Sequence, residues 1–216
     1  MLFSKTFATG LAMAATALAT ATPQQIADGL ASITKKSLAL QAPAQSVTIV
    51  NAALIVIGQG PFPSIIAGFN DIVDTATVLA KSIGAAPSKR SADDNNAALA
   101  AAPVAVPVTV PVKMHARDLM TRDANADLVD TAFREFVRVH QNLLNILIGK
   151  ADILTSIPIV GAPVAQALRN DEGILDPIAI ALINLFPAQA LDIQVQANSL
   201  GGTLDLAISK YTNLQA

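Results

Sequence analysis

The chain contains no cysteine and no tryptophan, and only 4% of its 216 residues are aromatic. The absence of cysteine excludes disulfide cross-links, thiol nucleophiles and thiolate metal ligands. The scarcity of aromatic rings disfavours stacking platforms for carbohydrates or for nucleic acid bases. The folded chain must therefore be held together by its hydrophobic core, which a chain of this length is long enough to form.

Charge is scarce as well. Charged residues make up 14% of the chain and the formal net charge is −2, whereas a typical soluble domain is about 25% charged. No cluster of lysine and arginine is present that would neutralise phosphates, so no nucleic acid partner is expected. Hydrophobic residues make up 52% of the chain. This excess of apolar side chains is explained either by an apolar core alone, or by a groove for a hydrophobic ligand or an exposed adsorbing patch.

The N-terminal residues Met1–Ala21 have the pattern of a secretory signal peptide. Lys5 supplies a positive charge, Leu11–Leu18 is apolar, and either Ala17-Leu18-Ala19 or Ala19-Thr20-Ala21 has the small residues of a cleavage site. The alternative is that these residues form the first helix of the fold. The pattern predicts a secreted protein that is extracellular or associated with a cell wall.

We predict an all-α fold, a single helical bundle of about five to seven helices. Its halves are 22–84 and 125–216, and they are joined by an Ala/Pro-rich disordered insertion, 85–124. Lys89-Arg90 in this insertion is either a processing site or a pair of solvated charges. Polar residues and prolines interrupt every apolar run before the roughly 18 residues of a membrane span, so no transmembrane helix is expected.

Three helices are predicted in the first half of the chain. The first covers 23–42, with a capping box from Thr22 to Gln25, and Pro43 ends or kinks it. The second covers 44–57, where a high content of β-branched residues makes a strand the competing interpretation. The third covers 63–83, with Gly84 as its C-terminal cap.

The second half begins with the clearest helical pattern of the chain, Asn125–Ile148, with Asn125 as a plausible N-cap. A short helix over 164–169 and a polar turn over 170–173 are expected to follow. A further helix starts at Asp176-Pro177. The last helix, 187–213, is expected to turn Leu191 and Val195 inward, and Gly201-Gly202 within it indicates a kink or a close approach of a neighbour or ligand.

The sequence carries little evidence of catalysis. It lacks the motifs of serine hydrolases, zinc proteases, dinucleotide-binding folds and P-loops, so we predict no catalytic residue, no cofactor and no metal site. His140 faces the apolar stripe of 125–148 and is expected to be buried, neutral and paired with a polar neighbour. Its role is either structural or to orient the polar head of a ligand. An enzymatic interpretation would require a polar cluster around His140.

The candidate ligand-binding residues are therefore large side chains on inward faces, together with this histidine. They are Phe69, Phe133, Phe136, His140, Leu143, Leu144, Leu147, Ile183 and Phe186.

The segments Ala197–Tyr211 and, less specifically, Ala162–Leu168 resemble the fungal hydrophobic surface-binding protein A family, which is similar to the ligand-binding domains of cell-wall galactomannoproteins. The resemblance implies a secreted all-α bundle that adsorbs to hydrophobic surfaces, and in the mannoprotein branch a tunnel for a long-chain lipid. The chain departs from the family in its insertion and in lacking a Ser/Thr-rich stalk and an anchor signal.

The expected function is non-enzymatic binding of hydrophobic surfaces or fatty-acid-like lipids through an apolar groove, with cell-wall components as further possible partners. The alternative is a structural cell-wall or interaction protein with a filled core and no ligand.

Overall fold

The computed structural model describes residues 21–48, 51, 54, 59–85, 116–153 and 161–215. Within these ranges it contains long α-helices and no strand, which confirms the predicted all-α fold. The helices are α1 (Pro23–Gln45), α3 (Pro61–Ser82), α5 (Ala116–Ala151), α6 (Gly161–Leu185) and α7 (Ala190–Thr212), and the 3-10 turn η4 (Asn213–Gln215) follows α7. The predictions for Met1–Thr20, for 86–115 and for half of 44–57 lie outside the described residues. No helix among the described residues is both long and apolar enough to cross a membrane.

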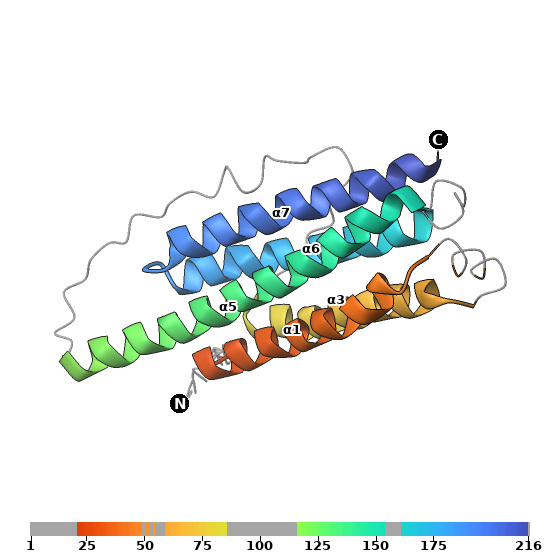
Figure 1. The fold of residues 1–216 in the computed structure, drawn as a ribbon. Helices are drawn as coiled ribbons and strands as arrows, with labels where there is room; N and C mark the ends of the chain where they lie inside the picture. The colour runs from red at the N-terminus through yellow and green to blue at the C-terminus, as the bar shows by residue number, and fades with distance from the viewer. Residues whose placement is uncertain are drawn as a thin grey trace, which may run out of the picture.

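The helices lie side by side (Figure 1), and the contacts between them form a closed ring. Helix α1 packs against α3 on one side and against α5 on the other. Helix α3 also packs against α6, α6 against α7, and α7 against α5, which closes the ring. Helices α5 and α6 are therefore not ring neighbours, and a side chain that joins them must reach across the interior.

All these helices contribute to one continuous hydrophobic core. Its largest fully buried side chains come from α1, α3, α5 and α7. They are Tyr211, Phe62, Phe69, Phe133, Phe136, Ile26, Leu30, Ile33, Ile65, Ile72, Leu143 and Leu144.

The start of α1 forms as its sequence predicts. The Thr22 hydroxyl accepts a hydrogen bond from the backbone N–H of Gln25, and the Gln25 side chain accepts one from the Thr22 N–H, which completes the capping box. Of the two outcomes predicted for Pro43, an end or a kink of the helix, the end is wrong, because α1 continues to Gln45. Pro43 removes one backbone donor in the last turn, but the continued helix buries Ala44 completely in the core.

The predicted helix over 63–83 is confirmed as α3, Pro61–Ser82. Gly84 follows it with φ of 73°, the left-handed conformation that commonly terminates a helix. A second glycine, Gly68, lies where α3 meets α1: a Cβ atom there would lie 2.2 Å from Leu40 Cδ2. The absence of a side chain at this position lets the two helices approach closely.

Helix α5 is longer than predicted. It begins at Ala116 rather than at Asn125, so Asn125 is not an N-cap and the last part of the expected insertion, 116–124, is helical. It also passes through Gly149 without interruption and ends at Ala151. Most of the predicted apolar stripe is buried, namely Val129, Phe133, Phe136, Val137, Leu143, Leu144 and Leu147, whereas Leu128 is 37% exposed and Ile148 is partly buried.

Helix α6 differs more from the sequence prediction than any other described helix does. The expected short helix, polar turn and second helix are one continuous helix, Gly161–Leu185, with Pro177 inside it. The turn-forming residues 170–173 remain helical because Asp171, Ile174 and Leu175 are buried against the rest of the ring. Tertiary packing therefore overrides the local turn preference.

Helix α7 begins at Ala190, after a turn at 187–189, and its inward face differs from the prediction. Leu191 and Val195 are 77% and 63% exposed, whereas Ile193 and Ala197 are buried. Gly201 and Gly202 lie in open surroundings, since a Cβ atom at either would meet nothing within 4 Å. They therefore mark no close approach of a neighbouring helix.

Candidate functional site

The centre of the ring contains a polar cluster that joins three helices. His140 on α5 contacts the Ser37 hydroxyl on α1 through Nδ1, over 2.9 Å, and Asp171 Oδ2 on α6 through Nε2, over 2.8 Å. All three side chains have no exposed surface. The burial and polar pairing predicted for His140 are thus confirmed. We call Ser37, His140 and Asp171 the polar centre.

The hydrogen-bond directions constrain the protons of the polar centre. The Ser37 Oγ also lies 3.0 Å from the backbone carbonyl oxygen of Ile33, to which it donates. A serine hydroxyl carries a single proton, so with that proton donated to Ile33 the Ser37 oxygen accepts from Nδ1–H of His140, and one more proton lies between His140 Nε2 and Asp171 Oδ2. An imidazolium beside an Asp171 carboxylate and a neutral imidazole beside a protonated Asp171 both satisfy all three contacts.

Asp171 keeps one oxygen without a partner. In the described part of the chain, no protein group donates a hydrogen bond to Asp171 Oδ1, although the atom is buried. Leaving a buried acceptor unsatisfied costs roughly 1–3 kcal/mol, and more for a charged group. A native interior seldom keeps such an atom without a structural or functional reason.

Aromatic rings cover the imidazole of His140. The Phe69 ring from α3 meets it edge-on, with centroids 6.2 Å apart, and the Phe136 ring lies 5.3 Å away at an interplanar angle of 40°. Phe133 in turn packs against Phe136, with centroids 6.1 Å apart. The polar centre is therefore surrounded by apolar side chains.

The structure brings most of the candidate ligand-binding residues together in this interior. Those on α3 and α5 are no more than 2% exposed and belong to the core, whereas Ile183 and Phe186, at the end of α6, are partly buried and pack against it. The fully buried set is Phe69, Phe133, Phe136, His140, Leu143, Leu144 and Leu147.

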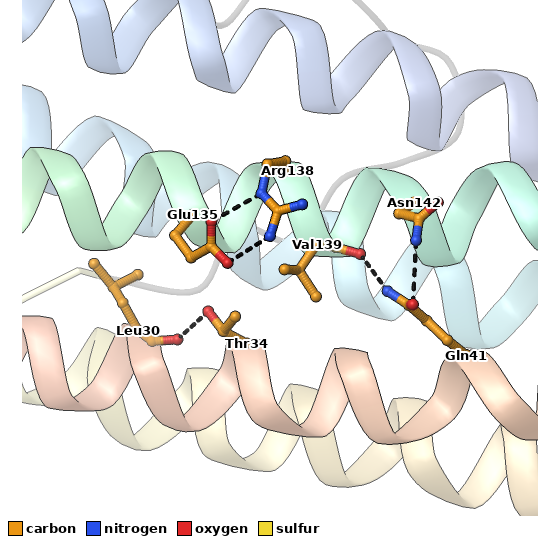
Figure 2. A network of polar contacts seen from close by, with 7 residues as sticks. All are labelled: Leu30, Thr34, Gln41, Glu135, Arg138, Val139 and Asn142. Carbon is orange, nitrogen blue, oxygen red and sulfur yellow. Dashed lines mark hydrogen bonds and ion pairs between the residues drawn. The ribbon is translucent and has the colours of Figure 1, made fainter.

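A polar seam beside the polar centre fixes the register of α1 against α5 (Figure 2). The Gln41 side-chain amide donates to the backbone carbonyl oxygen of Val139, over 3.2 Å, and accepts from the Asn142 amide, over 3.1 Å. On the outer side of α5, Arg138 bonds Glu135 through two nitrogens, which lowers the pKa of the Glu135 carboxyl below its ordinary value. Val139 and Asn142 lie on either side of His140 in the sequence, so their contacts with Gln41 hold Ser37 opposite His140.

The residue types of the polar centre are those of a nucleophile, a base and an acid. Its geometry does not suit acyl transfer, however. Ser37 donates its proton to Ile33 and lies in the middle of α1, where the backbone N–H groups are bonded within the helix. A serine hydrolase needs free N–H donors beside its nucleophile to stabilise the oxyanion, together with access for the substrate. Among the described residues, no group of three or more histidine and acidic side chains could hold a metal ion.

The outer face of α7 carries an exposed apolar stripe. Leu191, Val195 and Leu206 are exposed and recur at helical spacing, with the exposed Gly202 between them. We call these four residues the α7 stripe. The exposed polar residue Asn198 lies on the same face between Val195 and Gly202.

Sequence reasoning missed two members of the polar centre. Ser37 lies four residues after Ile33 and three before Leu40, so it interrupts the apolar face of α1. Asp171 occupies the same kind of position in α6, between Leu168 and Leu175. The signal was therefore a polar residue on an apolar face, and in α6 it was hidden by the predicted turn.

The chain matches no family model, no curated protein and no solved structure. The resemblance carried by Ala197–Tyr211 stays a prediction. The fold and the site define a class in physical terms: a cysteine-free ring of helices, apolar inside, with a buried serine–histidine–aspartate centre.

Proposed function

We propose that this protein binds long-chain hydrophobic molecules in the interior of its helical ring, and apolar surfaces through the α7 stripe, without catalysing a reaction. The observation that carries the proposal is the polar centre itself. A buried ionisable pair with an unsatisfied oxygen destabilises an apolar core, and apolar residues of similar volume would often serve stability equally well or better. Its presence is better explained by recognition of a ligand than by stability.

The surroundings of the polar centre suit an aliphatic chain. The side chains next to His140 are aromatic and aliphatic, and they come from helices on opposite sides of the ring. Burying an aliphatic chain contributes about 0.8 kcal/mol per methylene, so a long chain can offset the losses of association. Secretion and an association with a cell wall belong to this proposal and are supported by the N-terminal sequence pattern.

A structural protein with a filled core is the second candidate. It is favoured by the complete burial of Leu143, Leu144 and Leu147, which form part of the packed core. On this interpretation the polar centre fixes the register of three helices and binds nothing.

The absence of tryptophan allows a direct experiment. Native mass spectrometry of the purified protein with added laurate or lauryl alcohol should show a bound lipid. A Phe133→Trp variant would then report lipid in the interior through a change in fluorescence. Phe62→Trp is the matched control, because Phe62 is equally buried but lies outside the candidate ligand-binding residues.

The lipid should change the emission of the first variant and leave that of the second unaltered. If no lipid binds and the protein does not adsorb to alkane or polyester, the structural candidate replaces the proposal.

A further inference from the structure

The hydrogen-bonding capacity left at the polar centre consists of acceptors. The single Ser37 proton is donated to Ile33, the Nδ1–H of His140 is donated to the Ser37 oxygen, and the proton between His140 Nε2 and Asp171 Oδ2 is used by that contact. What remains is a lone pair on the serine oxygen and Asp171 Oδ1, which has no donor in the described part of the chain. The centre therefore offers no unused N–H or O–H group to a ligand.

We infer that the interior selects amphiphiles whose polar head is a neutral hydrogen-bond donor, such as a long-chain alcohol, and that the head donates to Asp171 Oδ1. This inference rests on the proposed function, since it specifies the class of ligand for the same interior. A hydroxyl is small, carries a proton to donate, and loses less hydration on burial than an ion does. It supplies the donor that Asp171 lacks.

A carboxylate head is disfavoured by the same geometry. A fatty-acid anion has acceptors and no donor, so beside Asp171 Oδ1 it would place two acceptor oxygens together in a medium of low dielectric constant, with no hydrogen between them. His140 offers no uncompensated positive charge to such a head, because its Nε2 lies 2.8 Å from Asp171 Oδ2. Long-chain alcohols and fatty-acid anions have the same kind of alkyl chain and would meet the same apolar side chains. The head group therefore decides which of the two binds more tightly.

The first experiment uses the unaltered full-length protein and four ligands built on a chain of twelve carbon atoms: lauryl alcohol, its methyl ether, dodecane and laurate. The ether keeps the oxygen and removes the donor. A hydrogen bond to a charged group contributes about 1.5–3 kcal/mol, so the alcohol should bind at least about tenfold more tightly than the ether and than laurate. The readout is the dissociation constant, from calorimetry or titration by native mass spectrometry.

The second experiment changes the acceptor. In Asp171→Asn the amide oxygen can keep the contact with His140, which leaves an N–H₂ donor in the place of Oδ1. The preference for the alcohol over the ether should fall by about tenfold, and binding of acceptor heads should improve. Asp205→Asn is the matched control, because it is the same change at an exposed position of α7.

The outcomes separate the inference from the function on which it rests. If alcohol, ether and dodecane bind equally, or laurate binds best, the interior holds lipid but the donor preference is wrong. If none of the four binds, the proposed binding of lipid in the interior fails as well. If Asp171→Asn does not fold, the comparison of alcohol and ether on the unaltered protein still decides the inference.

Discussion

The hydroxyl of Tyr211 on α7 donates a hydrogen bond over 3.0 Å to the backbone carbonyl oxygen of Leu147 on α5, and both side chains are completely buried. Burial raises the pKa of this phenol above its ordinary value of 10.0, because the phenolate would be poorly solvated inside the protein. The folded state therefore keeps its proton at pH values where the unfolded chain loses it.

Stability should consequently fall as the pH rises above about 10. A group whose pKa is raised in the folded state contributes stability that is fully present below the unfolded-state value and is lost above it. Tyr211 is the only tyrosine and tryptophan is absent, so tyrosinate absorbance reports this residue alone. Absorbance should change only together with unfolding, followed by circular dichroism. The prediction is contradicted if Tyr211 ionises near pH 10 while the helices remain intact.

Replacing Gly202 with alanine should stabilise the protein by about 0.5–1 kcal/mol. Gly202 is exposed inside α7, and an added Cβ atom would meet nothing within 4 Å, so the change only reduces the conformational entropy of the unfolded chain. The contrasting variant is Gly68→Ala, whose Cβ atom would lie 2.2 Å from Leu40 Cδ2 and should destabilise by about 1–3 kcal/mol. Urea denaturation of both variants measures the difference, and equal effects would disprove the close packing of α1 on α3.

Replacing His140 with leucine should destabilise the protein by about 3–5 kcal/mol. The change leaves the Asp171 carboxylate buried without its partner, which is the costly half of a broken buried pair. Adding Asp171→Leu should recover most of this loss, since two apolar residues of similar volume pack well in an apolar interior. Chemical denaturation of the two single variants and the double variant gives the coupling. Additive losses would show that the pair does not interact.

The α7 stripe can be tested separately from the interior. Changing Leu191 and Val195 together to glutamine should reduce adsorption to alkane droplets or polyester several-fold and alter stability by less than about 0.5 kcal/mol, because both side chains are exposed. Val78→Gln on α3 is the matched control, since Val78 is 69% exposed but lies on another helix. If the control lowers adsorption equally, the effect is one of general surface hydrophobicity and the stripe has no special role.

Local signals in the sequence predicted the structure correctly where the burial of a segment agrees with its local conformational preference. The capping box at Thr22, the terminating Gly84 and the apolar stripe around His140 all have strong short-range determinants, and all are present in the structure. The all-α fold could be predicted for the same reason, because each helix has an apolar face that it buries against neighbouring helices.

The sequence was misleading where tertiary packing overrides the local preference. Asn170–Gly173 has the composition of a turn, yet Asp171 is needed by His140 from another helix, and no single-sequence pattern contains that pairing. On α7 the buried face includes the small residues Ala197 and Ala207, so the larger Leu191 and Val195 were assigned to the wrong side. Prediction of the polar centre would have required knowing which helices meet.

The order of helices around the ring has a consequence for a chain that is cut. A single break between residue 85 and residue 116, for example at the dibasic pair Lys89-Arg90, would leave α1 and α3 on one fragment and α5, α6 and α7 on the other. The fragments would still share two long interfaces, α1 with α5 and α3 with α6, as well as the contact from Ser37 to His140. Proteolytic maturation at that point would yield a two-chain heterodimer held by non-covalent contacts alone.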